Sequence, residues 1–283
     1  MTAVYAKVAK IRKVKRDVRL VALDLDGTLF DDGKRVSHVT AEAIRDVVRR
    51  GEAKVCLVTA RPPRSVRAVW EELGLDTPSI HYNGALTWDA TRRISLRHKP
   101  LRGGICREMA TVAREVHPEV IVHAEVMDKW YTDRDDRSHV TETAKLFEPD
   151  GVVPLEECLK GSVTKLMFLA DEGPLKAVEE AIAAGFAGRV TMVRTDRDLI
   201  QITAPSVGKA RALASLAAYL EVPQVDVLAV GDALNDHGMI RWAGRGVAMG
   251  NAHPDVKAVA DWVAPTNEQD GVLAALRRYG VVR

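Results

Sequence analysis

The sequence is poor in cysteine. Its 283 residues include three, Cys56, Cys106 and Cys158, which lie far apart and form no CxxC pair. This spacing argues against a disulfide framework or a cysteine-based zinc site, because both need numerous or closely spaced thiols. Nor do the eight histidines form an HExxH pattern or a similar metal-binding spacing. We therefore expect reduced thiols and a cytoplasmic location.

Long hydrophobic runs and an excess of one charge are also missing. No stretch of about 18 consecutive apolar residues occurs, so no membrane span is expected. The 41 basic and 39 acidic residues give a net charge of +2, whereas a nucleic-acid protein usually has a strongly basic face. Only residues 1–16 are one-sided, with six basic residues and no acid. We interpret this segment as a solvated terminus, with a basic anchor for acidic partners as the alternative.

Signatures of several enzyme classes are absent. Gly208-Lys209 lacks the upstream glycine and the following Ser or Thr of a P-loop. Gly244-Arg245-Gly246 does not complete a dinucleotide-binding GxGxxG, and it does not follow the first predicted strand. No GxSxG occurs, so a hydrolase with a catalytic serine is not supported.

What the sequence does contain is an alternation of strands and helices at both ends. Buried strands are expected at 19–25, 54–59 and 79–82, with helices at 40–50 and 62–73 between them. We expect Thr40 to be the N-cap of the first helix and Gly51 to end it. The same rhythm returns after Lys209, with strands at 225–230, 246–249 and 261–264 and helices at 209–220, 235–243, 253–260 and 268–279. This pattern predicts a mainly parallel sheet covered by helices on both faces.

The middle of the chain has a different pattern. A hairpin is expected at 86–97, strand pairs at 120–126 with 130–132 and at 190–194 with 199–203, a strand at 163–170, and helices at 101–116 and 174–184. Strands joined by short turns predict an antiparallel α+β unit. We therefore predict two domains, one formed by residues 1–84 and 205–283 and one formed by the inserted residues 85–204.

The strongest motif is Asp24-Leu25-Asp26-Gly27-Thr28, at the end of the first predicted strand. Ligands of open parallel sheets gather beyond the carboxyl ends of the strands. There, one of two neighbouring carboxylates can attack phosphorus, and the other can protonate the leaving oxygen and later deprotonate water. Gly27 permits the sharp turn that such a site needs. The alternative is an ordinary Asp-Gly turn after a strand.

A second motif, Gly231-Asp232-Ala233-Leu234-Asn235-Asp236, follows the apolar strand expected at 225–230. A phosphate ester next to several carboxylates requires a cation, and oxygen ligands with few protein contacts suit Mg²⁺. Asp232 is the best candidate for the additional ligand. Asn235 and Asp236 are expected to hold metal waters or to order the loop, and the alternative for either is a helix N-cap.

Two further polar residues follow strand ends or begin helices. Thr59 ends the second predicted strand, where its hydroxyl can bind a phosphate oxygen, although such a threonine is more often structural. Lys209 begins a helix, where its charge and the helix N-terminus can both offset a phosphate. Most lysines in such positions are simply solvated.

Taken in order, these motifs resemble the haloacid dehalogenase (HAD) superfamily. The pattern is DxDGT, a strand-end Thr, a Lys and then GDxxND. Asn83-Gly84 and the run 246–252 (GVAMGNA) are similar to the Cof-type branch, which has a large α/β cap inserted between its second and third motifs. The stretch between Thr59 and Lys209 is long enough for such a cap. The resemblance implies a doubly wound, mainly parallel Rossmann-like core with an inserted α+β cap that selects the substrate.

The resemblance also implies roles for individual residues. Asp24 would be the nucleophile and a Mg²⁺ ligand, and Asp26 the general acid and base, with its backbone carbonyl on the metal. Asp232 would complete the metal ligands, with Asp236 behind them. Thr59, Lys209 and Asn235 are the predicted phosphate-binding residues. The candidate substrate contacts are Arg61, Asn83, Arg134, Lys165 and Arg194.

The sequence departs from the family pattern at Ala60, Ala210 and Gln201, where Gly, Gly and Glu are common. None of these changes removes a catalytic group. The predicted function is a Mg²⁺-dependent phosphatase acting on a small phosphorylated metabolite, most often a sugar phosphate in such proteins. A phosphomutase and a non-catalytic binding protein on the same fold are the alternatives.

Overall fold

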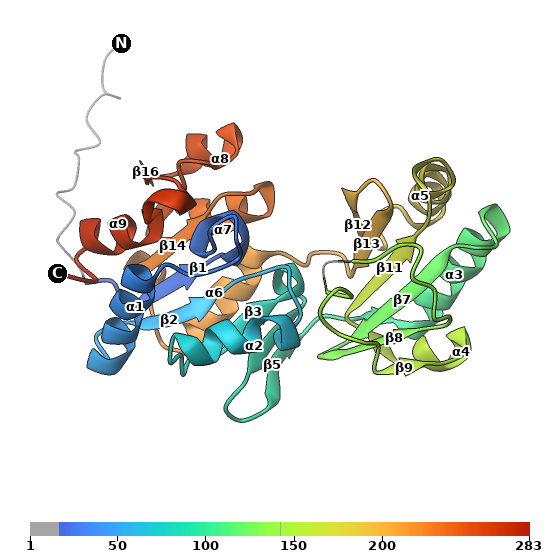
Figure 1. Cartoon of the computed structure of the whole chain (residues 1–283), viewed down its shortest axis with the longest axis horizontal. Coiled ribbons are helices and arrows are strands. Elements are labelled where there is room, and N and C mark those ends of the chain that lie inside the picture. Colours follow the sequence, from blue (N-terminus) through green and yellow to red (C-terminus); the bar gives the residue numbers. More distant parts are fainter. Residues whose placement is uncertain (1–16, 142) are drawn as a thin grey trace, which may run out of the picture.

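The computed structural model describes residues 17–141 and 143–283, and the basic segment 1–16 lies outside this part. The chain forms two main sheets, each with its own hydrophobic core (Figure 1). Within the described residues, no helix combines the length and the apolar composition that crossing a bilayer requires.

The first sheet is parallel and brings both ends of the chain together. Its strand order is β16-β15-β14-β1-β2, and all neighbouring strands are parallel. The bounds are β1 (Leu20–Leu23), β2 (Lys54–Leu57), β14 (Val227–Gly231), β15 (Arg245–Ala248) and β16 (Trp262–Val263). Because β1 and β14 are buried along their whole length, they lie in the centre of the core, as their apolar runs predict.

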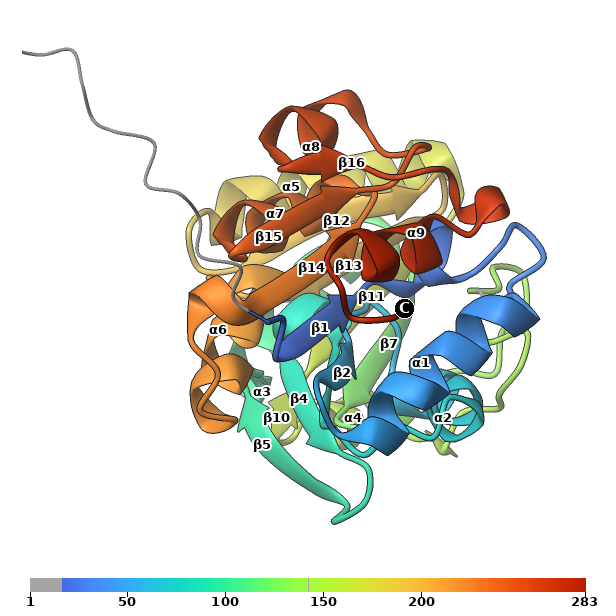
Figure 2. The ribbon, with the colours of Figure 1, turned by 90° about the vertical axis from the view of Figure 1, so that its left-hand side faces the viewer.

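Helices cover this sheet on both faces (Figure 2). They are α1 (His38–Arg50), α2 (Pro63–Glu72), α6 (Lys209–Tyr219), α7 (His237–Trp242), α8 (Pro254–Val259) and α9 (Gly271–Arg278). The predicted fold class, α/β with a mainly parallel sheet, is therefore confirmed. The predicted N-cap of α1 is wrong: Ser37, not Thr40, occupies that position, and its Oγ accepts from the Thr40 amide. Gly51 ends α1 as expected, with a φ of 66°.

A three-stranded antiparallel sheet continues from the parallel one. It consists of β3 (Ser79–His81), β4 (Leu86–Asp89) and β5 (Ile94–His98). A parallel bridge between Val58 and Ile80 connects it to the end of β2. The hairpin predicted at 86–97 thus pairs with the strand that precedes the insertion.

The second main sheet is almost entirely antiparallel, with strand order β12-β13-β11-β7-β8-β9. Its strands are β7 (Ile121–Val126), β8 (Lys129–Thr132), β9 (Gly151–Val152), β11 (Lys165–Leu169), β12 (Thr191–Asp196) and β13 (Leu199–Thr203). A short pair, β6 (Leu101–Arg102) with β10 (Ser162–Val163), and a one-turn helix, α4 (Leu155–Cys158), complete the unit.

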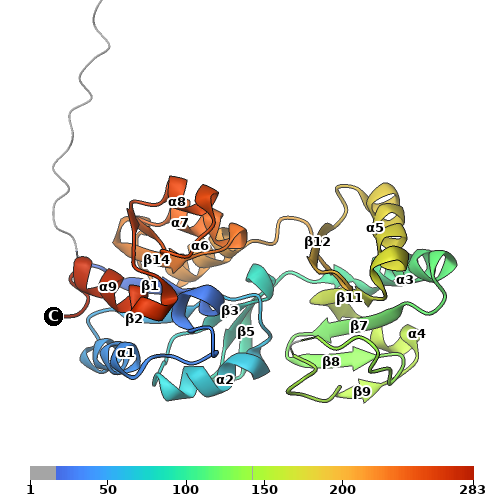
Figure 3. The same cartoon turned by 45° about the horizontal axis from the view of Figure 1, so that its top comes forward.

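Two long helices, α3 (Gly103–Val116) and α5 (Glu172–Phe186), cover the face of this second sheet that points away from the parallel sheet (Figures 1 and 3). Leu166, Phe168 and Ile200 belong to the core on that side. The opposite face therefore points toward the parallel sheet and is open to a ligand.

The turn between β3 and β4 touches the segment that returns the chain from the second main sheet to the first. A Cβ placed on Gly84, which has a φ of 100°, would lie 2.6 Å from the carbonyl oxygen of Gly208. Only glycine allows this approach at that φ. This turn and the returning connection therefore lie side by side, next to the start of α6.

Candidate active site

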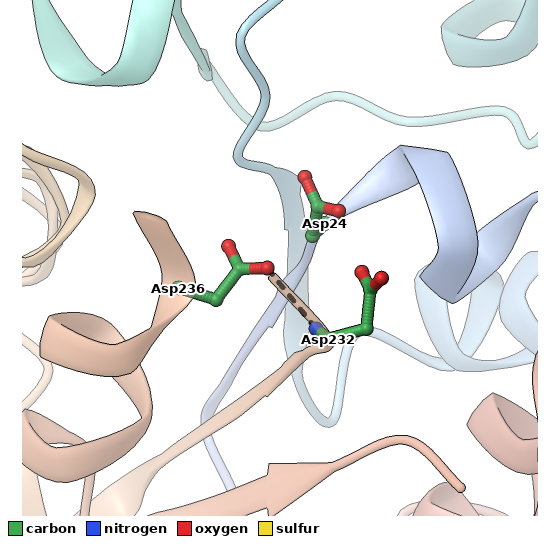
Figure 4. Close-up of side chains that lie close together, drawn as sticks. All are labelled: Asp24, Asp232 and Asp236. Carbon is green, nitrogen blue, oxygen red and sulfur yellow. Dashed lines mark hydrogen bonds between the residues drawn. The ribbon is translucent and has the colours of Figure 1, made fainter. Parts of the chain in front are cut away.

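Three acidic side chains meet beyond the carboxyl ends of the two central strands (Figure 4). Leu23 of β1 is in register with Val230 of β14, and the amide of Asp24 donates to the carbonyl of Val230 at 3.1 Å. The chain leaves both strands at the same level, so Asp24 and Asp232 lie next to each other. One oxygen from each of Asp24, Asp232 and Asp236 lies within 4.8 Å of the others.

A buried lysine joins two of these carboxylates. Nζ of Lys209, in the first residue of α6, donates to Oδ1 of Asp24 and to Oδ1 of Asp236, both at 2.6 Å. The side chains of Lys209, Asp24 and Asp236 are 1%, 7% and 0% exposed. Burial alone would lower the pKa of Lys209, but the two carboxylates raise it well above its usual value. The lysine therefore stays charged.

Asp236 orders the loop that carries Asp232. Its Oδ2 accepts hydrogen bonds from the amides of Asp232 and Ala233, at 3.0 and 3.1 Å. Both carboxylate oxygens of Asp236 therefore have donors within the protein. Of the alternatives that the motif allowed, the structure places Asp236 as the residue that orders the loop.

Asp24 and Asp232 each keep one oxygen that accepts nothing. Lys209 occupies Oδ1 of Asp24, and the Thr28 hydroxyl donates to Oδ1 of Asp232 at 2.8 Å. No other hydrogen bond or ion pair reaches these two side chains from the described parts of the chain. Their other oxygens are left for an external group.

The electrostatics of this cluster call for a cation. Burial and the neighbouring charge of Asp236 raise the pKa of Asp24 to about 8. Burial also raises the pKa of Asp232, to about 6. The hydrogen bond from Thr28 opposes this shift, and the charge of Asp236 adds to it. One lysine faces three crowded carboxylates, and an oxygen-preferring dication would offset the remaining charge. The donor set thus fits Mg²⁺, which Asp24 and Asp232 could hold.

Asp26 lies in a separate charged group at the surface of the site. Its carboxylate accepts from Nε and Nη2 of Arg61, at 2.7 and 2.6 Å, and from Nζ of Lys34, at 2.8 Å. Burial opposes ionisation, but these hydrogen bonds outweigh it and lower the pKa of Asp26. Our sequence interpretation missed Lys34, because a lysine in a polar turn carries no signal of its own.

The other predicted phosphate-binding residues form one hydrogen-bonded row. Oγ1 of Thr59, which is 1% exposed, accepts from the Arg61 amide at 3.1 Å. The Asn83 amide donates to the Thr59 carbonyl at 3.0 Å, and Nδ2 of Asn235 donates to Oδ1 of Asn83 at 2.9 Å. Hydrogen bonds thus connect residues from three separate motifs in one row.

A cavity of about 650 Å³ extends from Asp26 toward the second sheet. Its walls are charged or polar near the parallel sheet and mixed near the antiparallel one. They include Asp26, Lys34, Arg61, Glu125, Lys165, Met167, Leu199 and Gln201. Of the predicted substrate contacts, the structure brings Arg61 and Lys165 to this cavity.

Three predicted substrate contacts do not line this cavity: Asn83, whose side chain accepts from Asn235, and Arg134 and Arg194. Arg134 pairs with Glu119 at 2.9 Å, and Arg194 pairs with Glu179 at 3.2 Å and donates to backbone carbonyls. Neither lines the cavity that contains Asp26. Each guanidinium is used by acidic or carbonyl groups of the second unit, which explains why a basic residue there need not face a ligand.

One buried polar group between the two units was not predicted. Arg64, on α2, donates to Oε1 of Glu125 at 2.8 Å, and the Tyr82 hydroxyl donates to Oε2 of Glu125 at 3.0 Å. The side chain of Glu125 is 2% exposed, so these contacts replace its hydration. Glu125 could have been found only as the acid in a strand of mostly apolar residues.

Comparisons with known proteins agree with this arrangement. The sequence model described as haloacid dehalogenase-like hydrolase matches residues 21–276. The 5-amino-6-(5-phospho-D-ribitylamino)uracil phosphatase YitU of Bacillus subtilis is 31% identical over 267 residues, which cover 92% of this chain and 97% of that protein. Phosphatase YwpJ of the same organism is 29% identical, covering 92% of this chain and 99% of that protein.

Solved structures show the same fold. TM0651 from Thermotoga maritima superposes with a TM-score of 0.83 at 25% identity, covering 92% of this chain and 97% of that chain. BT1666 from Bacteroides thetaiotaomicron, described among phosphatases of the Haloalkanoate (HAD) enzyme superfamily, has a TM-score of 0.77 at 26% identity and covers 99% of this chain and 100% of that one.

The site depends on the absence of a side chain at Gly27, which gives a first prediction. A Cβ there would lie 2.4 Å from Oδ2 of Asp232, and the φ of Gly27 is 75°. Gly51 has a similar φ of 66°, but a Cβ on it would meet nothing within 4 Å. Gly51→Ala should lower the free energy of unfolding by about 1–2 kcal/mol, the cost of left-handed backbone alone. Gly27→Ala should cost clearly more in urea denaturation, and equal losses would contradict the tight contact.

Proposed function

This chain belongs to the haloacid dehalogenase-like hydrolase family and is a phosphatase, and we propose that it hydrolyses a small phosphorylated metabolite with Mg²⁺, through an aspartyl phosphate on Asp24. The observation that carries this proposal is the state of the Asp24 carboxylate. Lys209 holds one oxygen at 2.6 Å, and the other accepts no hydrogen bond from the described residues. Such a carboxylate is fixed in position and has one oxygen left to react.

The proposed reaction has two steps. In the first, Asp24 attacks phosphorus, the bond from phosphorus to the leaving oxygen breaks, and that oxygen takes a proton from Asp26. In the second, water gives a proton to Asp26 and attacks phosphorus, and the bond between phosphorus and Asp24 breaks. Phosphate and the alcohol leave, and both aspartates return to their starting forms.

Asp26 must be protonated for the first step, and its surroundings offer a way. In this structure Arg61 and Lys34 hold it ionised. A substrate phosphate would compete for both cations. Asp26 would then lose the donors that lower its pKa and gain a negative neighbour, and both changes favour the protonated form.

The remaining groups would bind the phosphate and the metal. The Lys209 ammonium and the amides at the start of α6 supply positive charge, and the Thr59 hydroxyl adds a donor. Asp24 and Asp232 would hold Mg²⁺, with the Asp26 carbonyl as the further ligand that the family resemblance implies. When bound, Mg²⁺ would neutralise charge on the transferring phosphoryl group.

We place substrate selection in the inserted unit, residues 85–204. The cavity beyond Asp26 has walls from both units, which supports a division between reaction and recognition. The hairpin β4–β5 pairs with β3, so the part that covers the site begins after His98. A sugar phosphate is the first candidate substrate. A ribitylamino-pyrimidine phosphate is the second, because YitU carries the name of a phosphatase for such a compound.

The nucleophile is tested by Asp24→Asn. This change keeps the shape of the side chain but removes the attacking charge, so turnover of a sugar phosphate panel should fall by several orders of magnitude. The fold should survive, since one of three crowded negative charges is removed. Circular dichroism would check folding, and Asp46→Asn, at a half-exposed position on α1, is the matched control. Near wild-type phosphate release by folded Asp24→Asn protein would refute the mechanism.

The metal is tested by chelation and by thermal stability. Activity should vanish with EDTA and return with Mg²⁺, while Ca²⁺ should support it poorly because it prefers larger and looser coordination. Mg²⁺ should also raise the melting temperature of the wild type, because it relieves repulsion between Asp24 and Asp232. That rise should disappear in Asp232→Asn. Full activity in metal-free buffer would rule out this part of the proposal.

A further inference from the structure

Lys165 occupies an unusual place in the second sheet. Along β11, Leu166 and Phe168 point into the core under α3 and α5, so Lys165 and Met167 lie on the opposite face. That face lines the cavity that also contains Asp26. A lysine at this position is therefore directed toward the site where the leaving group of a phosphate ester would lie.

This lysine is buried, and no described residue pairs with its ammonium group. Lys165 is 6% exposed, and among the residues that the structure describes none accepts a hydrogen bond from its Nζ or forms an ion pair with it. Its Nζ lies over the face of the Tyr82 ring, 5.3 Å from the ring centroid. An ammonium carries three donors, and no side chain of the described residues satisfies them, although Lys165 lines the cavity.

Glu125, the nearest candidate for an ion pair with Lys165, already accepts hydrogen bonds from other residues. Glu125 stands directly opposite Lys165 in the register of β7 and β11. Its two carboxylate oxygens, however, accept from Arg64 at 2.8 Å and from the Tyr82 hydroxyl at 3.0 Å. Glu125 moderates the charge of Lys165 without satisfying its donors, and burial still lowers the pKa of this lysine. The arrangement leaves an ammonium that a ligand can complete.

The residues around Lys165 indicate the chemistry of the rest of that ligand. Met167 and Leu199 give the cavity an apolar wall beside it. Gln201 lies opposite Met167 in the neighbouring strand, and its Nε2 donates to the Thr195 hydroxyl at 3.1 Å, which orients its amide. Arg61 and Lys34 lie at the phosphate end of the same cavity. Charged donors thus stand at the phosphate end and again on the wall of the second sheet.

We propose that Lys165 is a specificity residue, and that it binds a carboxylate or carbonyl oxygen carried by the leaving group of the substrate. This inference rests on the proposed phosphatase function and narrows its substrate class. The favoured substrates are phosphate esters of sugar acids or of other small molecules with such an oxygen. A simple polyol phosphate lacks this acceptor and is a poorer fit.

Matched substrates test this directly. Alditol phosphates and the corresponding aldonate and aldonamide phosphates, with three to six carbons, differ only in the group at the end remote from the phosphate. For at least one chain length, the wild type should prefer the aldonate or the aldonamide by about 10- to 100-fold in kcat/KM, the size expected for a hydrogen bond to a charged donor. Lys165→Met should abolish this preference, by raising KM for the aldonate and aldonamide phosphates more than for the alditol phosphates.

The control is Lys176→Met, which changes an exposed lysine on α5 of the same unit and should alter nothing. The absence of any acceptor preference in the wild type would overturn the inference. So would an equal loss for all substrates in Lys165→Met, because that pattern indicates a general structural effect.

Thermal unfolding separates recognition from a structural role. If Lys165 has no structural role, Lys165→Met replaces a largely buried lysine by an apolar side chain and should raise the melting temperature by about 2–4 °C. A fall in melting temperature would instead show that Lys165 supports Glu125 in the fold, and would contradict the inference.

Binding without turnover distinguishes this inference from the proposed reaction. Calorimetric titration of Asp24→Asn protein with the same phosphates should show the acceptor preference, and the double variant Asp24→Asn with Lys165→Met should lose it. If the wild type does not hydrolyse these phosphates but the binding preference remains, the mechanism is wrong and the inference stands. If alditol phosphates are hydrolysed but no binding preference exists, the inference fails alone.

Discussion

The structure of the site depends on one arrangement, two buried carboxylates paired with a single buried ammonium. Lys209 contacts Asp24 and Asp236 at 2.6 Å each, and almost nothing of these side chains is exposed. The contact joins the end of β1, the start of α6 and the loop after β14, which come from the two ends of the chain. Buried charges are stable only when they are paired, so the fold must keep these three elements together.

In the same site, the three carboxylates differ in how many of their oxygens accept hydrogen bonds, and this difference is useful. Asp236 is satisfied by Lys209 and by the amides of its own loop, whereas Asp24 and Asp232 each keep one oxygen to which no described residue donates. The raised pKa values of Asp24 and Asp232 reflect this crowding. A dication and a phosphoryl group would together relieve it. Without these ligands the site is therefore electrostatically unfavourable. Functional sites commonly differ from the rest of a fold in this way. Lys165, across the cavity, is likewise a charged side chain whose hydrogen-bonding capacity the described residues leave unused.

The sequence was sufficient to predict how the motifs converge, because parallel strands place their carboxyl ends at one edge of a sheet. Asp24, Thr59 and Asp232 all follow strands, and each position could be predicted from an apolar run that ends in polar residues. What could not be predicted depends on side-chain reach. Lys34 reaches Asp26 from a turn, and Arg64 and Tyr82 reach Glu125 across the two units. Arg134 and Arg194 looked equally suitable as substrate contacts in the sequence, but acids on their own unit hold them. The N-cap of α1 was misplaced because Ser37 and Thr40 are both good caps, and only the backbone shows which is used.

The central claim is that Asp24 carries the phosphoryl group during turnover. An acyl phosphate is reduced by borohydride, and an aspartyl phosphate is thereby converted to homoserine. Wild-type enzyme mixed with Mg²⁺ and a hydrolysed phosphate ester should be quenched within one turnover, reduced, digested and sequenced by mass spectrometry. The account predicts homoserine at position 24 only when substrate and Mg²⁺ are both present. Unmodified Asp24 while phosphate is released, or homoserine at another aspartate, would contradict it.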